Sequence, residues 1–109
     1  MWEQVEVDLP SDVAAATTSI WHYPGIMLVG VMRRNFLSPP ILWAQVLKAG
    51  LSNLRKAPDL VTELQHLIAS PTVYAEAELQ APRNQALLRY LGFVELPEVY
   101  ERKLYLRSI

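Results

Sequence analysis

One segment near the C-terminal end constrains the fold of this chain more than any other. Residues 72–79 alternate between apolar and polar side chains without a break, which predicts a half-buried β-strand. Pro82 then opens a helix, because proline suits the first helical turn, and Gly92 ends it, because glycine tolerates the left-handed conformation of a helix stop. Phe93 follows and is expected to turn back onto the core. A strand, a helix and a sharp stop therefore succeed one another here.

The first half of the chain predicts a strand, a helix and two further strands. Residues 4–9 alternate and predict a strand that a proline ends, and a serine then caps a predicted helix over residues 12–20. The apolar run 26–32 has the length of a strand and is apolar on both faces, as expected in the centre of a sheet. Residues 41–47 predict its antiparallel neighbour.

A leucine-rich helix is predicted between the strands at 41–47 and 72–79. Pro58 with Asp59 begins it, and Pro58 either kinks one long helix from residue 50 onward or divides two short ones. Its apolar residues share one face, namely Leu60, Val61, Leu64, Leu67 and Ile68. Strand, helix and strand in this order make a right-handed crossover between parallel strands.

The C-terminal part completes the predicted sheet. The helix over residues 82–91 is expected to turn four side chains inward, those of Ala86, Leu87, Tyr90 and Leu91. Residues 93–96 and 99–107 predict two closing strands. The prediction is a single domain over residues 1–109, of the α/β class, with a central mixed sheet, a βαβ crossover and two to three flanking helices.

Composition and charge exclude several classes of function. A formal net charge of -1 and a pI near 6.1 give no field that would attract nucleic acid or an anionic membrane. The basic residues Arg102, Lys103 and Arg107 are interpreted as solvated strand ends with rim salt bridges. The chain has no cysteine, and His22 and His66 have no carboxylate at metal-ligand spacing, so no metal site is expected. The longest apolar run at the front of the chain is far shorter than the roughly 20 residues that span a bilayer.

The apolar share of the chain is high for its size. Apolar residues make up 51% of the sequence and charged residues 19%, which is more apolar surface than a small monomer easily hides. In one interpretation another chain covers part of it, around Trp2 or Trp21. In the other, three tryptophans fill a small core without any partner.

The segment Leu87-Leu-Arg-Tyr-Leu-Gly-Phe93, with the order of predicted elements over residues 41–107, resembles the GNAT acyltransferase family. It is most similar to the small GNAT-like proteins of bacteriophages, in which an apolar pair, a basic residue and an aromatic precede the same Leu-Gly-Phe stop. The resemblance implies a GNAT fold and, if the protein is an enzyme, acetyl-CoA as cofactor. It also implies the cytoplasm of a host cell, or a virion, as the location.

The resemblance implies a place for the cofactor. In this family a glycine-rich turn between the central strand and the crossover helix holds the pyrophosphate through backbone N–H groups. The corresponding stretch, residues 46–53, has one glycine, Gly50. Lys48, Gly50 and Ser52 are therefore the candidate cofactor-binding residues, although a plain strand-to-helix turn with a surface lysine explains them as well.

The resemblance also implies a base and an acid. The family's acid is a tyrosine of the last helix, and Leu88 occupies that position here. Glu76 and Glu78 lie on the strand whose partner splays away in this family, and they are the candidate bases, or else part of a solvated face. Tyr90, two residues beyond the family's position, is the third catalytic candidate, or a core or rim residue.

Two functions follow as hypotheses. The first is a phage-type GNAT-fold protein with a degenerate acyl-CoA site that acts by binding other protein chains, as a virion or assembly component and as a homo-oligomer. The second is an acetyl-CoA-dependent N-acetyltransferase, with Lys48, Gly50 and Ser52 at the pyrophosphate and Glu76 or Glu78 as base through a water molecule.

Overall fold

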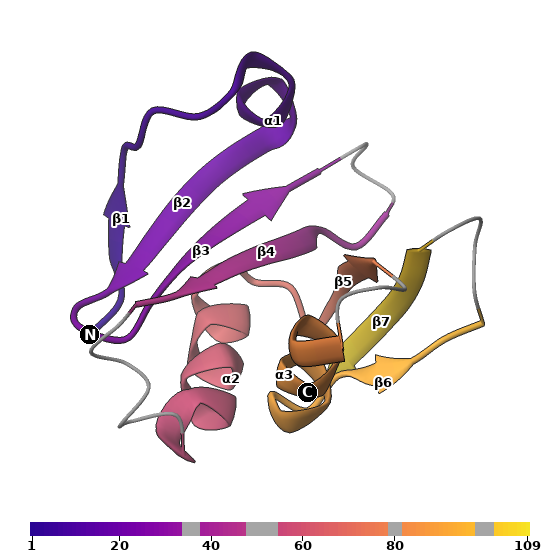
Figure 1. Ribbon diagram of the computed structural model, residues 1–109. Helices are drawn as coiled ribbons and strands as arrows, with labels where there is room; N and C mark the ends of the chain where they lie inside the picture. Colours follow the sequence, from indigo (N-terminus) through magenta and orange to yellow (C-terminus); the bar gives the residue numbers. More distant parts are fainter. Residues whose placement is uncertain (34–37, 48–54, 79–81, 98–101) are drawn as a thin grey trace.

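The computed structural model describes residues 1–33, 38–47, 55–78, 82–97 and 102–109. These residues form seven strands and three helices, in the order β1 (Glu3–Val5), α1 (Ser11–Ala16), β2 (Thr17–Tyr23), β3 (Met27–Met32), β4 (Ile41–Val46), α2 (Ala57–Leu67), β5 (Thr72–Glu78), α3 (Pro82–Tyr90), β6 (Val94–Glu95) and β7 (Arg102–Ser108) (Figure 1). All seven strands belong to one sheet, in the order β1-β2-β3-β4-β5-β7-β6. The predicted α/β class with a mixed sheet is confirmed.

The strands β4 and β5 are parallel neighbours joined through α2, which confirms the predicted crossover. Their registered pairing in the described residues consists of Ile41 opposite Tyr74, and the Tyr74 N–H donates to the Pro40 carbonyl at 2.9 Å. By contrast, six residue pairs register between β3 and β4 and seven between β5 and β7. The two strands therefore diverge beyond this pair and leave a gap between two parts of the sheet, β1 to β4 and β5-β7-β6 (Figure 1).

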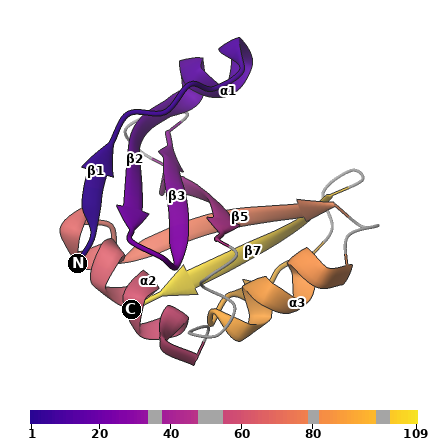
Figure 2. The same cartoon turned by 60° about the vertical axis from the view of Figure 1, so that its left-hand side comes forward.

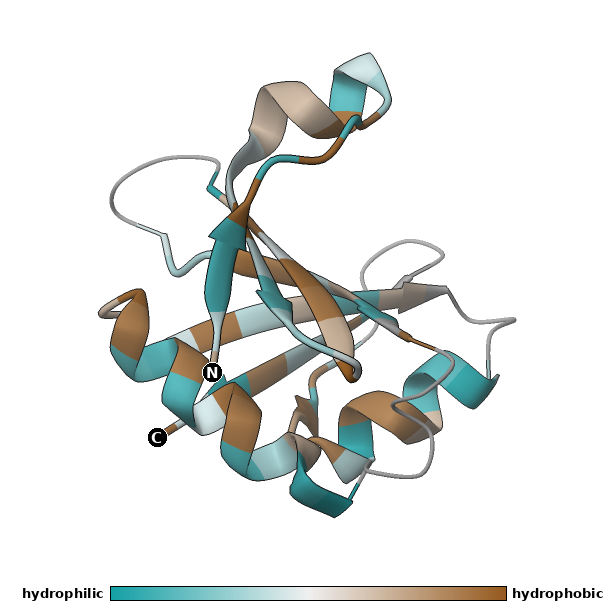
Figure 3. Cartoon of the chain, turned by 90° about the vertical axis from the view of Figure 1, so that its left-hand side faces the viewer, coloured by the Kyte–Doolittle hydropathy of each residue, from teal (hydrophilic) through white to brown (hydrophobic). Residues whose placement is uncertain are grey.

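The hydrophobic core lies between the sheet and the helices α2 and α3, which are on the same side of the sheet (Figures 2 and 3). We call this side of the sheet the helix-covered face. The strands contribute Met27, Val29, Val31, Leu42, Val73, Ala75, Ala77 and Tyr105 to it, and the helical segments contribute Ala57, Leu60, Val61, Leu64 and Leu91. Successive strand residues alternate between faces, so the neighbours of these strand residues project from the opposite side.

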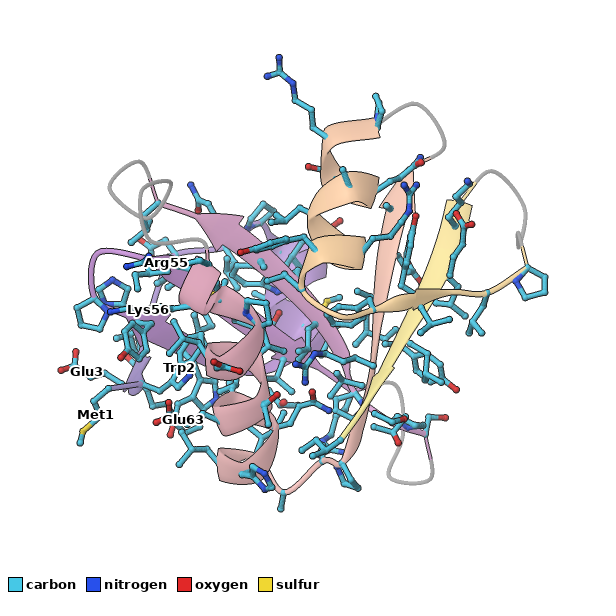
Figure 4. All side chains as sticks on the ribbon, turned by 90° about the horizontal axis from the view of Figure 1, so that it is seen from below. Met1, Trp2, Glu3, Arg55, Lys56 and Glu63 are labelled. Carbon is cyan, nitrogen blue, oxygen red and sulfur yellow. The ribbon has the colours of Figure 1, made fainter. Side chains whose placement is uncertain are left out.

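Trp2 is buried in the chain's own core, so it needs no cover from another chain. Its side chain is 5% exposed and its Nε1 donates to the Leu60 carbonyl at 2.9 Å, which ties the N-terminal segment to α2 (Figure 4). The Tyr23 ring meets the indole edge-on at a centroid distance of 5.4 Å. Trp21 is half-buried and donates from Nε1 to the Ser19 hydroxyl at 3.0 Å. Trp2 therefore contributes to the core and not to an exposed apolar surface.

Helix α2 begins at the place that the sequence predicts. Pro58 lies in its first turn, and Asp59 places a carboxylate at the positive end of the helix dipole. Leu60 and Leu64 are buried as expected, whereas Leu67 is 51% exposed. The helical stretch expected from residue 50 lies mostly outside the described residues.

The predicted helix over residues 12–20 is wrong beyond Ala16. Helix α1 has six residues, and the chain then enters β2, in which Ile20 is buried. Threonine and isoleucine at the start of β2 favour the extended conformation, because β-branched side chains are restricted in a helix and pack well on a sheet. The first strand is also shorter than predicted, because β1 ends at Val5 rather than Leu9.

Arg107 is buried, which corrects its interpretation as a solvated strand-end residue. Its side chain donates from Nε to the Leu91 carbonyl at 2.8 Å, from Nη1 to Gln65 Oε1 at 2.6 Å, and from Nη2 to the Pro58 carbonyl and Thr62 Oγ1, both at 2.8 Å. Burial lowers the pKa of the Arg107 guanidinium, which still stays charged at neutral pH. The residue ties β7 to α2 and to the end of α3.

The rim salt bridge expected near the C-terminus forms at Lys103. Its Nζ lies 2.7 Å from Glu95 Oε1, across the β6–β7 pair. The hydrogen bond from Lys103 lowers the pKa of the Glu95 carboxyl. The side chain of Arg102 lies outside what the structure describes.

Candidate functional site

The gap between β4 and β5 holds a cavity of about 220 Å³. Both strands and the helices α2 and α3 supply its walls, including Leu42, Ala44, Ala75, Leu87 and Leu88. The described walls are apolar except at three residues, Trp43, Glu76 and Asn84. The cavity is therefore an apolar chamber with a single carboxylate among its described lining residues.

Backbone groups also face this gap. The Leu47 N–H donates to Ile26 on the β3 side at 2.8 Å, and peptide groups alternate in direction along a strand. The N–H and C=O of Ala44 therefore face β5. On the other side the backbone N–H of Tyr74 points toward β4. The N–H and C=O of Glu76, two residues further along β5, therefore point into the gap as well. A ligand between the strands meets backbone donors and acceptors from both.

The Trp43 side chain forms part of the cavity wall and lies close against Gly30 of β3. Gly30 is its direct cross-strand partner, and a Cβ added to Gly30 would lie 1.9 Å from Trp43 Cε2. Only glycine leaves room for the indole in this position. The Trp43 Nε1 is buried and has no hydrogen-bond partner in the described structure. Sequence reasoning overlooked this contact, although a glycine inside an apolar strand is the usual signal of a close approach.

Of the predicted catalytic candidates, the structure brings Glu76 to the cavity. The residue is half-buried on β5 and lines the chamber. The side chain of Glu78 lies outside what the structure describes. Tyr90 is 48% exposed and is not among the described residues that line the cavity, and its catalytic role stays a prediction. The candidate cofactor residues Lys48, Gly50 and Ser52 also lie outside the described residues.

The inner face of α3 differs in part from the predicted one. Leu87 packs against the core as predicted, whereas Ala86 and Tyr90 are exposed and Gln85 and Leu88 face inward instead. Leu88, at the position of the acid in the family pattern, lines the cavity. The structure therefore places an apolar side chain where that family has a proton donor.

The described residues contain no cluster of three or more His, Asp or Glu side chains that would hold a metal ion. Among the same residues no helix combines the length and the hydropathy needed to cross a bilayer.

No protein-family model and no curated protein sequence matches the chain. Solved structures do match it. A chimera of the spermidine N-acetyltransferase SpeG from Vibrio cholerae aligns with a TM-score of 0.59 at 14% identity, over 76% of this chain and 58% of that one. A GNAT-family acetyltransferase from Listeria monocytogenes aligns with a TM-score of 0.59 at 9% identity, over 84% of this chain and 63% of that one.

The Campylobacter jejuni N-acetyltransferase PseH, in complex with acetyl coenzyme A, aligns with a TM-score of 0.57 at 10% identity, over 83% of this chain and 65% of that one. The chain thus spans about three-fifths of the length of the acetyltransferases that it matches. At these identities the likeness concerns the fold. With the strand order and the parallel β4–β5 junction, it shows that the chain has the fold of GNAT-family acetyltransferases.

Proposed function

We propose that the protein binds an acyl-coenzyme A, with the acyl thioester in the cavity between β4 and β5, and transfers the acyl group to an amine. The observation that carries this proposal is the cavity itself, an apolar chamber at the parallel junction between β4 and β5, with Glu76 in its wall. PseH, which shares the fold, was solved with acetyl coenzyme A bound.

The size of the cavity suits one end of the cofactor. Pockets that enclose a drug-sized ligand measure about 300–1,000 Å³, whereas this one measures about 220 Å³. It can enclose a short acyl group and its thioester but not the nucleotide. Leu42, Leu88 and Leu91 give the acyl group an apolar wall. The peptide N–H groups of Ala44 and Glu76, which face the gap, are placed to donate to a carbonyl oxygen that gains negative charge.

Glu76 supplies the base. Its carboxylate accepts a proton from the acceptor amine, directly or through one water molecule, and the amine nitrogen attacks the thioester carbonyl carbon. An amide bond forms, the carbon–sulfur bond breaks, and coenzyme A leaves as a thiolate that takes up a proton. A thiol has a pKa of about 8.5, so the thiolate departs without a dedicated acid. Leu88 at the acid position is compatible with this route.

The rest of the cofactor is assigned on sequence alone. Lys48, Gly50 and Ser52 precede α2 in the chain and are proposed to hold the pyrophosphate. As for the acceptor, spermidine carries several positive charges, whereas Glu76 is the single carboxylate among the described lining residues. We therefore propose an acceptor with one amine next to an apolar group rather than a polyamine.

The test is an assay of thiol release from acetyl-CoA with a panel of amines, which includes spermidine and peptides with free N-termini. Glu76→Gln should lower kcat/KM by about 10²- to 10⁴-fold, because the amide cannot accept the proton. Glu63→Gln, at an exposed carboxylate of α2, is the matched control and should leave turnover unchanged. Turnover by Glu76→Gln at the wild-type rate would remove Glu76 from the mechanism, and no product with any amine would remove the enzyme proposal.

A second candidate is the binding role, in which the protein is an assembly component without turnover. Leu88 in place of a proton donor favours it. The association with bacteriophages, which rests on the Leu-Gly-Phe segment, belongs to this candidate and stays a prediction. Acetyl-CoA that binds without turnover, in a protein that forms stable complexes, is the result that separates it from the first.

A further inference from the structure

The cavity between β4 and β5 has two sides of different chemistry. Glu76, in its wall, projects to the side of the sheet away from α2 and α3, because its neighbours Ala75 and Ala77 are core residues of the helix-covered face. Other lining residues belong to the helix-covered face, and two of them, Met27 and Leu64, are fully buried. The cavity therefore extends from a carboxylate on one side of the sheet into the hydrophobic core on the other.

The part of the cavity on the helix-covered side offers no hydrogen bond from its described side chains. We call this part the cavity floor, and it is lined by Met27, Val29, Val61, Leu64, Leu87 and Leu91. A water molecule needs two to four polar partners, and these six side chains supply none. Methionine adapts its shape to what it encloses, because its chain is unbranched. The floor therefore suits a hydrocarbon group.

The volume of the cavity exceeds what an acetyl thioester fills. An apolar protein cavity of about 150 Å³ holds one benzene molecule, so each heavy atom takes roughly 25 Å³. The sulfur, carbonyl and methyl atoms of an acetyl thioester then occupy roughly 100 Å³, less than half of the cavity's 220 Å³. A butyryl thioester needs roughly 150 Å³, a hexanoyl thioester roughly 200 Å³ and an octanoyl thioester roughly 250 Å³. Hexanoyl is thus the longest of these chains that the cavity encloses.

We infer that the acyl group is a straight chain of about four to six carbons, with its tail on the cavity floor and its carbonyl in the gap between β4 and β5. The inference rests on the proposed function, which places the thioester between the peptide groups of Ala44 and Glu76. The tail then extends toward α2 and α3, which cover this side of the sheet (Figure 2). The acceptor amine approaches from the side of the Glu76 carboxylate, so the two substrates do not compete for space.

Chain length should set the affinity for the acyl-CoA. Each methylene that leaves water for an apolar site tightens binding about fourfold. Butyryl-CoA should therefore bind about 15-fold more tightly than acetyl-CoA, and hexanoyl-CoA on the order of 200-fold more tightly. Octanoyl-CoA should bind more weakly than hexanoyl-CoA, because its thioester is larger than the cavity. The affinity thus has an optimum at hexanoyl-CoA.

The test is isothermal titration calorimetry of the full chain with coenzyme A and with its acetyl, butyryl, hexanoyl and octanoyl thioesters. Two variants should move the optimum in opposite directions. Val61→Phe makes the floor smaller and should favour butyryl-CoA or acetyl-CoA, whereas Leu87→Ala makes it larger and should favour octanoyl-CoA. Leu67→Phe, at an exposed leucine of α2, is the control and should keep the hexanoyl optimum. Far-UV circular dichroism checks that each variant is folded.

Three results would overturn the inference and leave the proposed function standing. Acetyl-CoA that binds as tightly as hexanoyl-CoA would show that the floor takes no acyl tail. Free coenzyme A that binds as tightly as butyryl-CoA would show that its pantetheine arm, and not the acyl group, occupies the cavity. A hexanoyl optimum that neither folded variant moves would place the tail outside the floor. If none of the five ligands binds, the proposed function itself fails, and the inference fails with it.

Discussion

The Nη1 atom of Arg107 donates to Oε1 of Gln65 at 2.6 Å, between two buried side chains that lie 42 positions apart in the chain. The Gln65 amide nitrogen in turn donates to the Pro71 carbonyl at 3.1 Å. A buried charge is tolerated when every donor finds an acceptor, and the guanidinium donates to carbonyl, amide and hydroxyl oxygens. This network holds α2 on the sheet next to the cavity.

Arg107→Met is expected to lower the free energy of unfolding by about 2–4 kcal/mol, because it leaves buried carbonyl and amide oxygens without donors. Urea unfolding measures the change. Arg83→Met, at an exposed arginine of α3, is the control and should change stability by less than about 0.5 kcal/mol. If Gln65→Leu and Arg107→Met add without coupling in the double variant, the two residues do not act as a unit.

Gly92→Ala and Gly25→Ala form a matched pair. Both glycines have positive φ, +94° and +76°, so alanine should cost about 1–2 kcal/mol at each. At Gly92 the new Cβ would also lie 3.2 Å from Arg107 Nε, whereas nothing lies within 4 Å at Gly25. Thermal unfolding should therefore show Gly92→Ala as the more destabilising of the two. Equal losses would mean that Arg107 moves aside at no cost.

Gly30→Ala should destabilise the protein by about 1–3 kcal/mol, because a methyl group has to displace the Trp43 indole that lies on Gly30. Trp43→Leu removes the obstacle at its own cost. The loss of unfolding free energy in the double variant should be about 0.5–3 kcal/mol smaller than the sum of the two single losses. Full additivity in urea unfolding would contradict a close contact between the Trp43 indole and Gly30.

The Glu95–Lys103 pair predicts a small pH dependence of stability. The pKa of Glu95 is lower in the folded chain than its ordinary value of 4.5, through the hydrogen bond from Lys103. The contribution is fully present above pH 4.5 and is lost as the pH falls through the folded pKa below it. Lys103→Met should flatten this part of the profile. The effect should be small, because the pair is exposed to solvent. An unchanged profile in circular dichroism melts would show that the pair contributes nothing.

Local sequence signals were enough for most of the fold. The alternation in residues 72–79 predicted β5, and Pro58 predicted the first turn of α2. Gly92 was predicted to end a helix, and it has the positive φ that such a stop requires. These features depend on one residue and its neighbours. The helix predicted over residues 12–20 failed at β2, because three alanines favour a helix locally while Ile20 gains more by pairing in the sheet.

The site was predictable only in part. Glu76 was a candidate base through the family resemblance, and the structure places it in the wall of the cavity. Arg107 and Trp43 were missed, since their environments depend on partners far away in the chain or across the sheet. Neither burial against a distant helix nor an indole lying on a glycine leaves a periodic pattern in the sequence.

The central claim is that the β4–β5 cavity receives an acyl thioester, and the melting midpoint with and without acetyl-CoA tests it most directly. Ligand at about 100 times its dissociation constant adds about 2.7 kcal/mol, which should raise the midpoint of a domain of this size by roughly ten degrees. Leu88→Trp should fill the cavity and abolish the shift, whereas Leu67→Trp, on the outer side of α2, should keep it. No shift in the wild type with millimolar acetyl-CoA, or an undiminished shift in a folded Leu88→Trp variant, would contradict the account.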